Sequence, residues 1–488
     1  MPEDAAPAAT SRPLSARKAR LCEISDRWAP ERDAFVAKNQ AFHDDDRRFL
    51  RFLIPEGLRV LEIGCGTGGL LAALKPAKGF GIDISEPMVA RARAAHPGLD
   101  FVVGDIEDSA TIEALAGPFD AIVIADAIGM LDDCQATFAS LRPLCHADTR
   151  LVVAYHNYLW EPVLRLAEAL KLRMPEPLTN WLRPADIANL LELADFEAVR
   201  TEWRQLIPKR LLGIGTLINR FIATLPLIRK LCLRHYLVAR PRPMGERENL
   251  SASVVVPCRN ERGNIASIVA RIPRFCDDLE IVFVEGGSSD GTWDEIVRVK
   301  ADNPGRDIKL FKQGGKGKGD AVRNGFANAR GDVLMILDAD MTVAPEELPK
   351  FYAPLATGRG EFVNGTRLVY PLERDSMRLL NRVANHTFSA LFTWLLNQRF
   401  TDTLCGTKAL RRRHYERIAA GRAYFGDFDP FGDFDLIFGA AKLSLKVVEV
   451  PIRYAARTYG ATNISRFRHG WLLVRMVGFA FWKLKALP

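Results

Sequence analysis

Short apolar runs that end in glycine or in acidic residues recur along the chain. They lie at 58–63, 79–84, 101–103, 119–124 and 151–154 in the first half, and at 253–257, 279–284, 308–312 and 333–341 in the second. Stretches with helical spacing follow most of them, and this alternation predicts parallel sheets covered by helices. The carboxyl ends of parallel strands share one edge, where α/β proteins bind ligands. Candidate chemistry is therefore expected at the strand ends.

The stretch 333–341, VLMILDADM, is the clearest of these strand ends. An apolar run leads into Asp338-Ala339-Asp340, and residues two apart in an extended strand end project to the same side. Both carboxylates can then face one Mg²⁺ or Mn²⁺ ion and the diphosphate of a sugar nucleotide. An isolated triplet of this kind equally fits two solvated turn aspartates, so the neighbouring motifs decide between the two interpretations.

Size and composition narrow the class of protein. A chain of 488 residues with 48% hydrophobic and 26% charged residues predicts two or more globular domains. A net charge of +8 favours anionic partners. The eight cysteines form no CxxC pair and no zinc-type cluster, which is typical of reduced thiols in a cytosolic protein. We expect residues 1–20 to be a disordered leader, and no apolar run reaches the length of a membrane span.

A glycine-rich turn, GCGTGG at 64–69, joins the first strand to a helix. Backbone N–H groups at such a turn and helix start bind anions and nucleotides, although the same letters fit a dinucleotide enzyme. Three features favour another cofactor. Glu62 precedes the glycines, Asp83 ends the second strand at a distance suited to ribose hydroxyls, and Gly104-Asp105-Ile106 follows the third.

With these motifs, residues 50–240 resemble the class I S-adenosylmethionine-dependent methyltransferases. The resemblance implies the following cofactor contacts: Glu62, Gly64, Gly66 and Gly68 on the methionine side, Asp83 at the ribose, and Asp105 and Ile106 beside the adenine. His156, after the strand 151–154, is a candidate base, and Asp126, after the fourth strand, has similar standing. A structural role for His156 is the alternative.

The segment 207–240 has apolar residues at helical spacing, and between them stand the cations Lys209, Arg210, Arg220, Arg229, Lys230 and Arg234. It predicts amphipathic helices that either lie in a membrane interface or pack on the protein with their charges solvated. We accordingly expect a methyltransferase domain at 21–240, a stiff linker at 241–250, a second domain at 251–470 and an amphipathic tail at 471–488.

The second half opens with Pro257, Asn260 and Glu261, and Asp338-Ala339-Asp340 is followed by the motifs NGTR at 364–367 and TDTLCG at 401–406. With these motifs it closely resembles the inverting family-2 glycosyltransferases with a GT-A fold, in particular the polyprenyl- or dolichol-phosphate mannosyltransferases. The resemblance rests on several motifs in the correct order and implies a Rossmann-like domain that follows the methyltransferase fold. It assigns donor binding to Pro257, Asn260, Glu261, Glu285, Asp290, Lys316 and Lys318, and positive charge near the phosphates to Arg367 and Arg457. The chain departs from the family at Glu285-Gly286, where two aspartates are usual.

The resemblance implies a metal held by Asp340 and Asp338, which neutralises the leaving nucleoside diphosphate. A phosphate acceptor is already ionised and requires no strong base, whereas a sugar hydroxyl requires one. Asp433 or Asp435 is then the candidate, and a helix-capping role for this pair is the alternative.

Together these patterns predict a bifunctional enzyme. The second domain transfers a sugar from a nucleotide donor to a polyprenyl phosphate or related lipid or glycan, and the first methylates an acceptor of the same pathway. Two alternatives stay open: a glycosyltransferase whose first domain only binds the cofactor or docks, and a basic nucleic-acid methyltransferase. The cations lie among apolar residues rather than in a polar, aromatic-interleaved patch, so no nucleic acid is expected. We expect a cytoplasmic protein with contact at the inner face of the cell membrane.

Overall fold

The structure is a computed structural model. It describes residues 14–174, 179–243, 247–367, 379–424, 434–452, 459 and 466–486, and within these the side chains of all but 379–386, 466–470 and 473. The chain divides into two compact units, residues 1–242 and 243–486. Each unit is described by itself.

Unit 1 is built on a mixed seven-stranded sheet in the order β3-β2-β1-β4-β5-β7-β6, as far as the described residues show. Only β7 is antiparallel to its neighbours, β5 and β6. The strands are β1 (Arg59–Ile63), β2 (Lys78–Asp83), β3 (Asp100–Val103), β4 (Phe119–Ala125), β5 (Cys145–His156), β6 (Phe196–Arg204) and β7 (Arg234–Pro241). The order reverses at β1, which places the carboxyl ends of β1 and β4 at the crevice where ligands bind.

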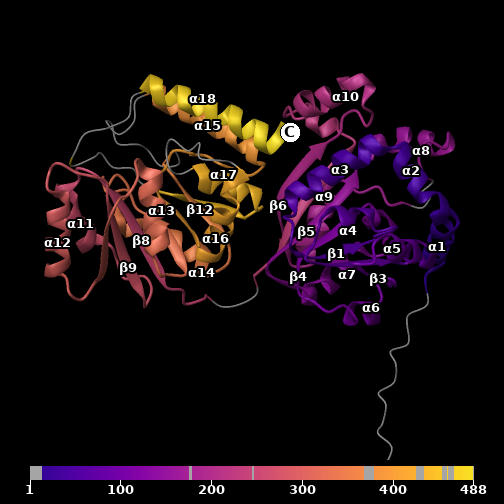
Figure 1. Ribbon diagram of the computed structural model, residues 1–488, viewed down its shortest axis with the longest axis horizontal. Helices are drawn as coiled ribbons and strands as arrows, with labels where there is room; N and C mark the ends of the chain where they lie inside the picture. The colour runs from indigo at the N-terminus through magenta and orange to yellow at the C-terminus, as the bar shows by residue number, and fades with distance from the viewer. Residues whose placement is uncertain are drawn as a thin grey trace, which may run out of the picture. The chain divides into compact units, whose positions relative to one another are not determined.

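Helices flank this sheet, as Figure 1 shows in indigo to magenta. They are α1 (Ala16–Trp28), α2 (Arg32–Lys38), α3 (Gln40–Leu53), α4 (Gly69–Ala73), α5 (Glu86–Ala95), α6 (Ser109–Glu113), α7 (Cys134–Ser140), α8 (Glu161–Ala169), α9 (Pro184–Leu193) and α10 (Ile214–Leu217). Helix α1 begins inside the stretch 1–20 that was expected to be a disordered leader. The expectation of disorder is therefore wrong for Ala16 onward.

The segment 207–240 differs from its predicted helical form. Residues 211–231 form short helical turns around α10, but Arg234–Pro241 is strand β7, paired on both sides within the sheet. The large apolar side chains of RHYLVAR, residues 234–240, also fit the helical spacing on which the prediction rests. Tertiary pairing with β5 and β6 decides the conformation, because both faces of β7 are buried.

Unit 2 has a second mixed seven-stranded sheet among its described residues, in the order β10-β9-β8-β11-β13-β12-β14. Strand β13 is antiparallel to β11 and β12. The strands are β8 (Ala252–Cys258), β9 (Leu279–Glu285), β10 (Asp307–Lys312), β11 (Val333–Ile336), β12 (Phe362–Thr366), β13 (Lys408–Arg411) and β14 (Val447–Pro451). The helices are α11 (Arg262–Arg271), α12 (Thr292–Asp302), α13 (Lys318–Asn328), α14 (Leu348–Ala356), α15 (Leu379–Leu396), α16 (Arg412–Ala420), α17 (Phe434–Lys442) and α18 (Arg466–Phe481).

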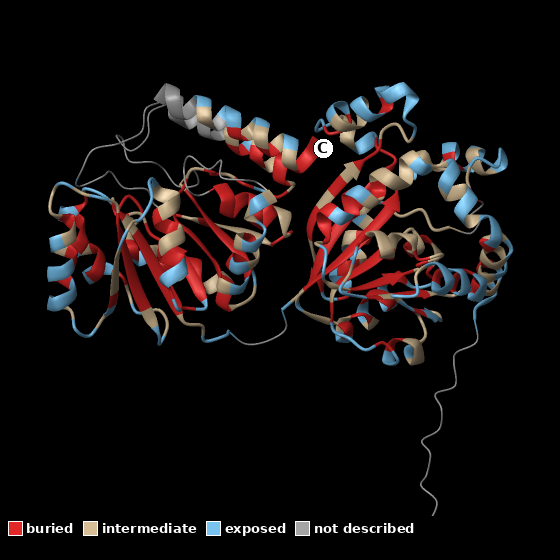
Figure 2. Cartoon of the chain, in the orientation of Figure 1, coloured by how far each residue is buried: buried red, intermediate tan, exposed pale blue. Residues whose placement is uncertain are grey.

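The central strands of both sheets are buried, whereas most helices alternate buried and exposed positions, as the red strands of Figure 2 show. Parallel strands covered on both faces require such continuous apolar runs, which is why these runs predicted the strands well. The two α/β units confirm the predicted fold class, a class I methyltransferase fold followed by a GT-A fold. Across the described residues, no helix has the length and hydropathy needed to cross a membrane.

Candidate functional sites at the sheet edges

The glycine turn after β1 approaches its neighbours too closely for side chains. Gly64 and Gly68 have φ angles of +74° and +78°, in the left-handed region that favours glycine. A Cβ on Gly64 would lie 2.5 Å from the Ala127 Cβ, and one on Gly68 would lie 2.6 Å from the Phe101 ring. The turn is held within the unit, because Gly64 and Cys65 donate their N–H groups to the Ile82 carbonyl and Gly68 donates to the Cys65 carbonyl. Ligand binding by this turn therefore stays a prediction.

Two acidic side chains flank this turn. Glu62 is 3% exposed, and its Oε2 has no hydrogen-bond partner among the described residues. Burial raises the Glu62 pKa to about 8. Asp83 accepts from the Gly66 N–H at 2.8 Å and from the Ser85 N–H at 3.0 Å, and burial raises its pKa as well. The Leu71 backbone hydrogen-bonds to the Glu62 carboxyl, but Oε2 is left without a partner in the described part of the chain. A buried carboxyl oxygen in this position fits the cationic amino group of an amino-acid moiety.

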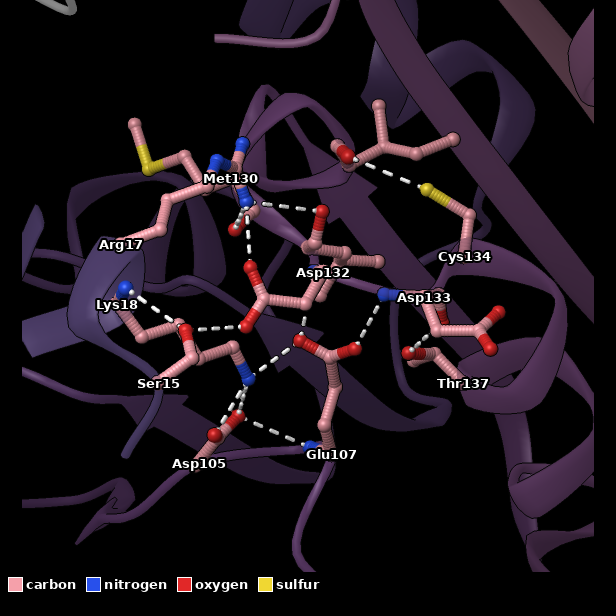
Figure 3. Close-up of polar contacts among 12 residues, drawn as sticks. Ser15, Arg17, Lys18, Asp105, Glu107, Met130, Asp132, Asp133, Cys134 and Thr137 are labelled. Atoms are coloured by element: carbon pink, nitrogen blue, oxygen red, sulfur yellow. Dashed lines mark hydrogen bonds and ion pairs between the residues drawn. The ribbon is translucent and has the colours of Figure 1, made fainter. Parts of the chain in front are cut away.

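Helix α1 crosses the edge near the end of β3 (Figure 3). The Lys18 ammonium donates to both oxygens of Asp105 and pairs with Glu107, and Arg17 pairs with Asp132 at 2.8 Å. Asp105, which the resemblance places at an adenine, is thus already held by a residue of α1. Sequence reasoning missed Lys18 because it lies in the stretch expected to be a leader.

Ile106, the other residue predicted beside the adenine, is buried in the hydrophobic core of unit 1.

A buried ion-pair cluster lies where β4 and β5 end. The His156 Nδ1 lies 3.0 Å from Asp126 Oδ1, and Asp126 also pairs with Arg234. Arg234 is fully buried and reaches Asp46 at 2.9 Å, while the His156 ring stacks on Phe42. Burial opposes ionisation of Asp126, yet Arg234 and His156 hold its pKa well below the usual value. The two candidates of the sequence, His156 and Asp126, are brought together.

Arg234 is a second residue that sequence reasoning placed wrongly. It was counted among the cations that face solvent or lipid, but it is buried between two carboxylates. No local signal identifies it, because its partners Asp46 and Asp126 lie 188 and 108 residues away in sequence.

The aspartate pair of unit 2 lies just beyond β11. The strand ends at Ile336, so Asp340 stands in a turn rather than on an extended strand end, and the assumed period-two geometry does not apply. Asp340 accepts from the Thr342 hydroxyl at 2.8 Å, and Asp338 pairs with Lys318 at 2.7 Å. Burial opposes ionisation of Asp338, but the pKa of its carboxyl is lowered because Lys318, Lys408 and Arg367 surround it.

The turn at Gly406 packs against Asp338 and Lys318. A Cβ at Gly406 would lie 1.9 Å from Asp338 Oδ2 and 2.5 Å from Lys318 Nζ. Only a glycine permits this close approach to Asp338. The carboxylates of Asp338 and Asp340 are oxygen donors of the kind that Mg²⁺ and Mn²⁺ prefer.

Arg367 lies in a bidentate pair with Asp402. Its Nε and Nη2 donate to Asp402 at 2.6 and 2.8 Å, and Asp402 is fully buried. The Asn364 amide in turn donates to the Asp402 carbonyl at 2.7 Å. Arg367 is therefore held in position from β12, with part of its charge neutralised by Asp402.

The loops after β8 and β9 interlock. The Asn260 N–H donates to the Ser288 hydroxyl, and its side-chain oxygen accepts from the Ser289 N–H, both at 2.9 Å. Glu285 accepts from the Ser288 N–H, and the buried Glu261 accepts from Asn264. These contacts join the predicted donor-binding loops into one edge.

The remaining predicted donor residues have varied surroundings. Pro257 lies within β8, and Lys316 is exposed in the loop before α13. Asp290 accepts from the Thr292 N–H at 3.0 Å at the start of α12, and the Thr292 hydroxyl helps to hold the pKa of Asp290 below its usual value against the effect of burial.

The predicted base pair is only partly visible. Asp435, on α17, is buried and lies 3.3 Å from both Arg323 and Arg422. Its carboxylate is therefore held by two cations of its own unit. Asp433 and Arg457 lie outside the described residues.

Each sheet carries glycine-containing loops and acidic residues at its carboxyl edge. This arrangement is typical of α/β domains that transfer a group from a nucleotide or nucleoside donor. Comparison with protein families agrees. A model described as "Methyltransferase domain" matches residues 35–201, and one described as "Glycosyl transferase family 2" matches residues 253–418.

Individual relatives match unit 2. The polyprenol monophosphomannose synthase of Mycolicibacterium smegmatis is 32% identical over 235 residues, which cover 46% of this chain and 84% of that protein. The dolichol-phosphate mannosyltransferase of Pyrococcus furiosus is 29% identical over 222 residues, covering 44% of this chain and 60% of that protein. The chain belongs to glycosyl transferase family 2, and it carries a methyltransferase domain in addition.

Solved structures resemble each unit weakly. A possible histamine N-methyltransferase from Thermotoga maritima is 18% identical with a TM-score of 0.36, covering 45% of this chain and 99% of that one. Glucosyl-3-phosphoglycerate synthase from Mycobacterium tuberculosis is 20% identical with a TM-score of 0.36, covering 48% and 80%. We draw no conclusion about substrate or mechanism from these two structures, because both TM-scores are low.

Proposed function

We propose that unit 2 transfers a sugar from a nucleotide-sugar donor to a polyprenyl phosphate or a related lipid or glycan acceptor. The observation that carries this proposal is the edge site of Asp338 and Asp340, surrounded by Lys318, Lys408 and Arg367 in a family-2 glycosyltransferase domain. Positive charge gathered at a strand edge stabilises a departing diphosphate. The named relatives are a polyprenol and a dolichol-phosphate sugar transferase, which supports a lipid phosphate as acceptor.

Asp338 and Asp340 would hold a divalent cation, Mg²⁺ or Mn²⁺, which supplies positive charge beside the leaving group. The interlocked loops of Asn260 and Ser288 would position the nucleotide. Glu285 and Gly286 stand where the family usually has two aspartates, and Glu285 already accepts from the Ser288 N–H. Because Gly286 has no carboxylate, a carboxylate contact to the base would come from Glu285 alone.

The acceptor follows from the base available at the site. A phosphate nucleophile is ionised at neutral pH and requires no proton acceptor. Asp435 is engaged by Arg323 and Arg422, which disfavours a role as general base for a hydroxyl. Of the two candidate bases only Asp435 lies within the described residues, and its engagement there favours a lipid phosphate over a glycan hydroxyl. If a hydroxyl acceptor reacts, Asp433 is the base to test.

Sugar transfer is tested with purified full-length protein, UDP- and GDP-linked sugars, Mg²⁺ or Mn²⁺ and a short polyprenyl phosphate. Transfer is expected for the wild type and lost in Asp340→Ala. Asp302→Ala is the matched control, because that carboxylate is exposed on α12 and contacts only Arg298 among the described residues. Full transfer by Asp340→Ala would refute the assignment of the metal site.

We further propose that unit 1 binds S-adenosylmethionine and methylates an acceptor of the same pathway. When bound, this cofactor supplies an electrophilic methyl group. Glu62 would bind the amino group of the cofactor and Asp83 its ribose, and the backbone of the glycine turn would lie against the cofactor. The unpaired Glu62 Oε2 and the close packing at Gly64 support this assignment. The chain would use His156 to remove a proton from the acceptor, because Asp126 fixes Nδ1 and leaves Nε2 to act as the base.

The role of His156 is tested by His156→Ala with tritiated S-adenosylmethionine and the glycosylated lipid as acceptor. Methyl transfer should fall while cofactor affinity stays. His146→Ala is the matched control, since His146 also pairs with an aspartate, Asp120 at 3.1 Å, at the opposite end of β5. If the wild type binds the cofactor but methylates no acceptor, unit 1 is a binding or docking module instead.

We propose that both reactions take place in the cytoplasm at the inner face of the cell membrane. All eight cysteines are unpaired, which is usual in a reducing compartment.

A further inference from the structure

An exposed apolar surface on unit 1 is left unused by both proposed reactions. It lies on the segment 211–231, around α10, where Leu212 is fully exposed and Leu227 is 84% exposed. Figure 2 shows this region largely in pale blue at one edge of the unit. We call residues 207–231 the basic apolar segment. Large apolar side chains gathered in one exposed segment mark an interaction surface rather than the scattered exposure that is normal for soluble proteins.

The backbone of this segment holds the leucines outward. Leu211 and Leu212 have φ angles of +44° and +55°, a left-handed conformation that costs a bulky residue free energy. The segment is nevertheless fastened to the unit. The Asn219 side chain donates to the Ile207 carbonyl and accepts from its N–H at 2.7 and 2.8 Å, and the Asn157 amide donates to the Lys230 carbonyl at 2.8 Å. The exposed leucines therefore stand on an anchored loop.

A second apolar element adjoins it. The Trp160 indole, at the start of α8, donates to the Leu231 carbonyl at 2.8 Å, which places α8 beside the end of the segment. Val163 and Leu166 on α8 are exposed as well. The apolar surface thus continues from the basic apolar segment onto α8.

The charge of the segment selects its partner. Residues 207–231 contain the five cations Lys209, Arg210, Arg220, Arg229 and Lys230 and no acidic residue. Lys209, Arg210 and Lys230 are exposed. Arg210 pairs with Asp44 of α3 at 3.1 Å, whereas the segment itself supplies no acidic residue to offset Lys209 and Lys230. Apolar side chains flanked by such cations match a bilayer with anionic headgroups, because the apolar groups enter the acyl boundary while the cations stay among the headgroups.

We propose that the basic apolar segment and α8 dock unit 1 on an anionic membrane surface. The inference does not depend on either proposed reaction, since it rests on exposure, anchoring and charge alone. The proposed membrane contact lies on unit 1. The family resemblance, by contrast, implies a lipid acceptor for unit 2 and no membrane contact for unit 1.

The test is flotation of the full-length protein with vesicles of phosphatidylcholine alone or mixed with phosphatidylglycerol. Binding is expected only to the mixed vesicles and should weaken as salt rises. Leu212→Glu with Leu227→Glu should lower the partition coefficient at least about tenfold, since each burial of a leucine is worth more than one decade. Leu193→Glu is the matched control, because Leu193 is an exposed leucine at the end of α9 in the same unit.

The charge contribution is tested separately by Lys230→Glu. This variant should weaken binding to anionic vesicles, and Lys75→Glu, an exposed lysine of the same unit, should not. Cofactor affinity measured by calorimetry reports that unit 1 of each variant is folded.

Several outcomes would overturn the proposal. Equal binding by the double leucine variant, equal binding to neutral vesicles, or absence of vesicle binding would each do so. If sedimentation velocity instead shows a dimer that the double variant dissociates, the surface joins two copies of the chain. Loss of vesicle binding in Trp482→Glu of unit 2, with the leucine variant unaffected, would move the contact to the C-terminal region.

Discussion

The protonation of Glu62 should control cofactor affinity. In the ligand-free protein, burial raises its pKa to about 8, so the side chain is mostly neutral at pH 7. A bound ammonium group favours the carboxylate form, because an opposite charge within hydrogen-bond distance lowers a carboxyl pKa. Binding of S-adenosylmethionine should therefore release a proton from Glu62.

The size of the effect follows from the pKa. At pH 7 about one Glu62 side chain in 11 is ionised, so affinity should be about 11-fold below its limit, and at pH 6 about 100-fold below. About 0.9 proton should be released on binding at pH 7. Each further pH unit on the acid side costs about 1.4 kcal/mol of binding free energy.

Calorimetric titration in buffers with different ionisation enthalpies measures both quantities. Affinities and proton release should be compared between about pH 6 and 7.5, because an α-amino group begins to lose its own proton above this range. Glu62→Gln should bind more weakly and without this pH dependence, because glutamine cannot ionise. A flat affinity profile for the wild type, with no proton released, would refute the assignment of Glu62 to the amino group.

Further predictions concern stability and the second site. Gly66→Trp should abolish cofactor binding and leave sugar transfer intact, because Gly66 has a φ of +53° in the glycine turn; calorimetry and the transfer assay check both. Gly406→Ala should lower kcat for sugar transfer at least about tenfold, since its Cβ would lie 1.9 Å from Asp338 Oδ2; a change of less than about twofold would contradict this. Asp402→Asn should destabilise unit 2 by about 3–5 kcal/mol, because Arg367 loses its buried counter-charge; urea unfolding measures this. Finally, the folded pKa of Glu62 lies above the ordinary value of 4.5, so wild-type stability should fall as pH rises from 4.5 toward about 8, and Glu62→Gln should not show this loss in thermal melts.

The strands were predictable because their signal is local. Each central strand is a run of apolar residues buried on both faces, and the glycines after β1 stand where positive φ angles are needed. The strand-end acids Glu62, Asp83 and Asp338 became candidates for the same reason, since each lies near the end of such a run or directly after it.

The rest of the site depends on contacts between distant parts of the chain. Lys18 could not be assigned from sequence, because its partner Asp105 lies 87 residues away and its own surroundings look like a polar leader. β7 was misassigned as helix because large apolar residues between cations suit either structure until neighbouring strands are known. The bidentate pair of Asp402 and Arg367 is likewise a contact between residues far apart in sequence, since 35 positions separate them.

The position of Arg234 bears on how the protein is made. Asp46 and Asp126 converge on one guanidinium that belongs to the last strand of unit 1. While the chain is still being synthesised, Asp126 has only His156 as a partner among the described side chains, and Asp46 has no guanidinium to pair with until residue 234 has emerged. The ion-pair cluster beside His156 can therefore be completed only after nearly all of unit 1 has been synthesised, and shortly before the first strand of unit 2 follows.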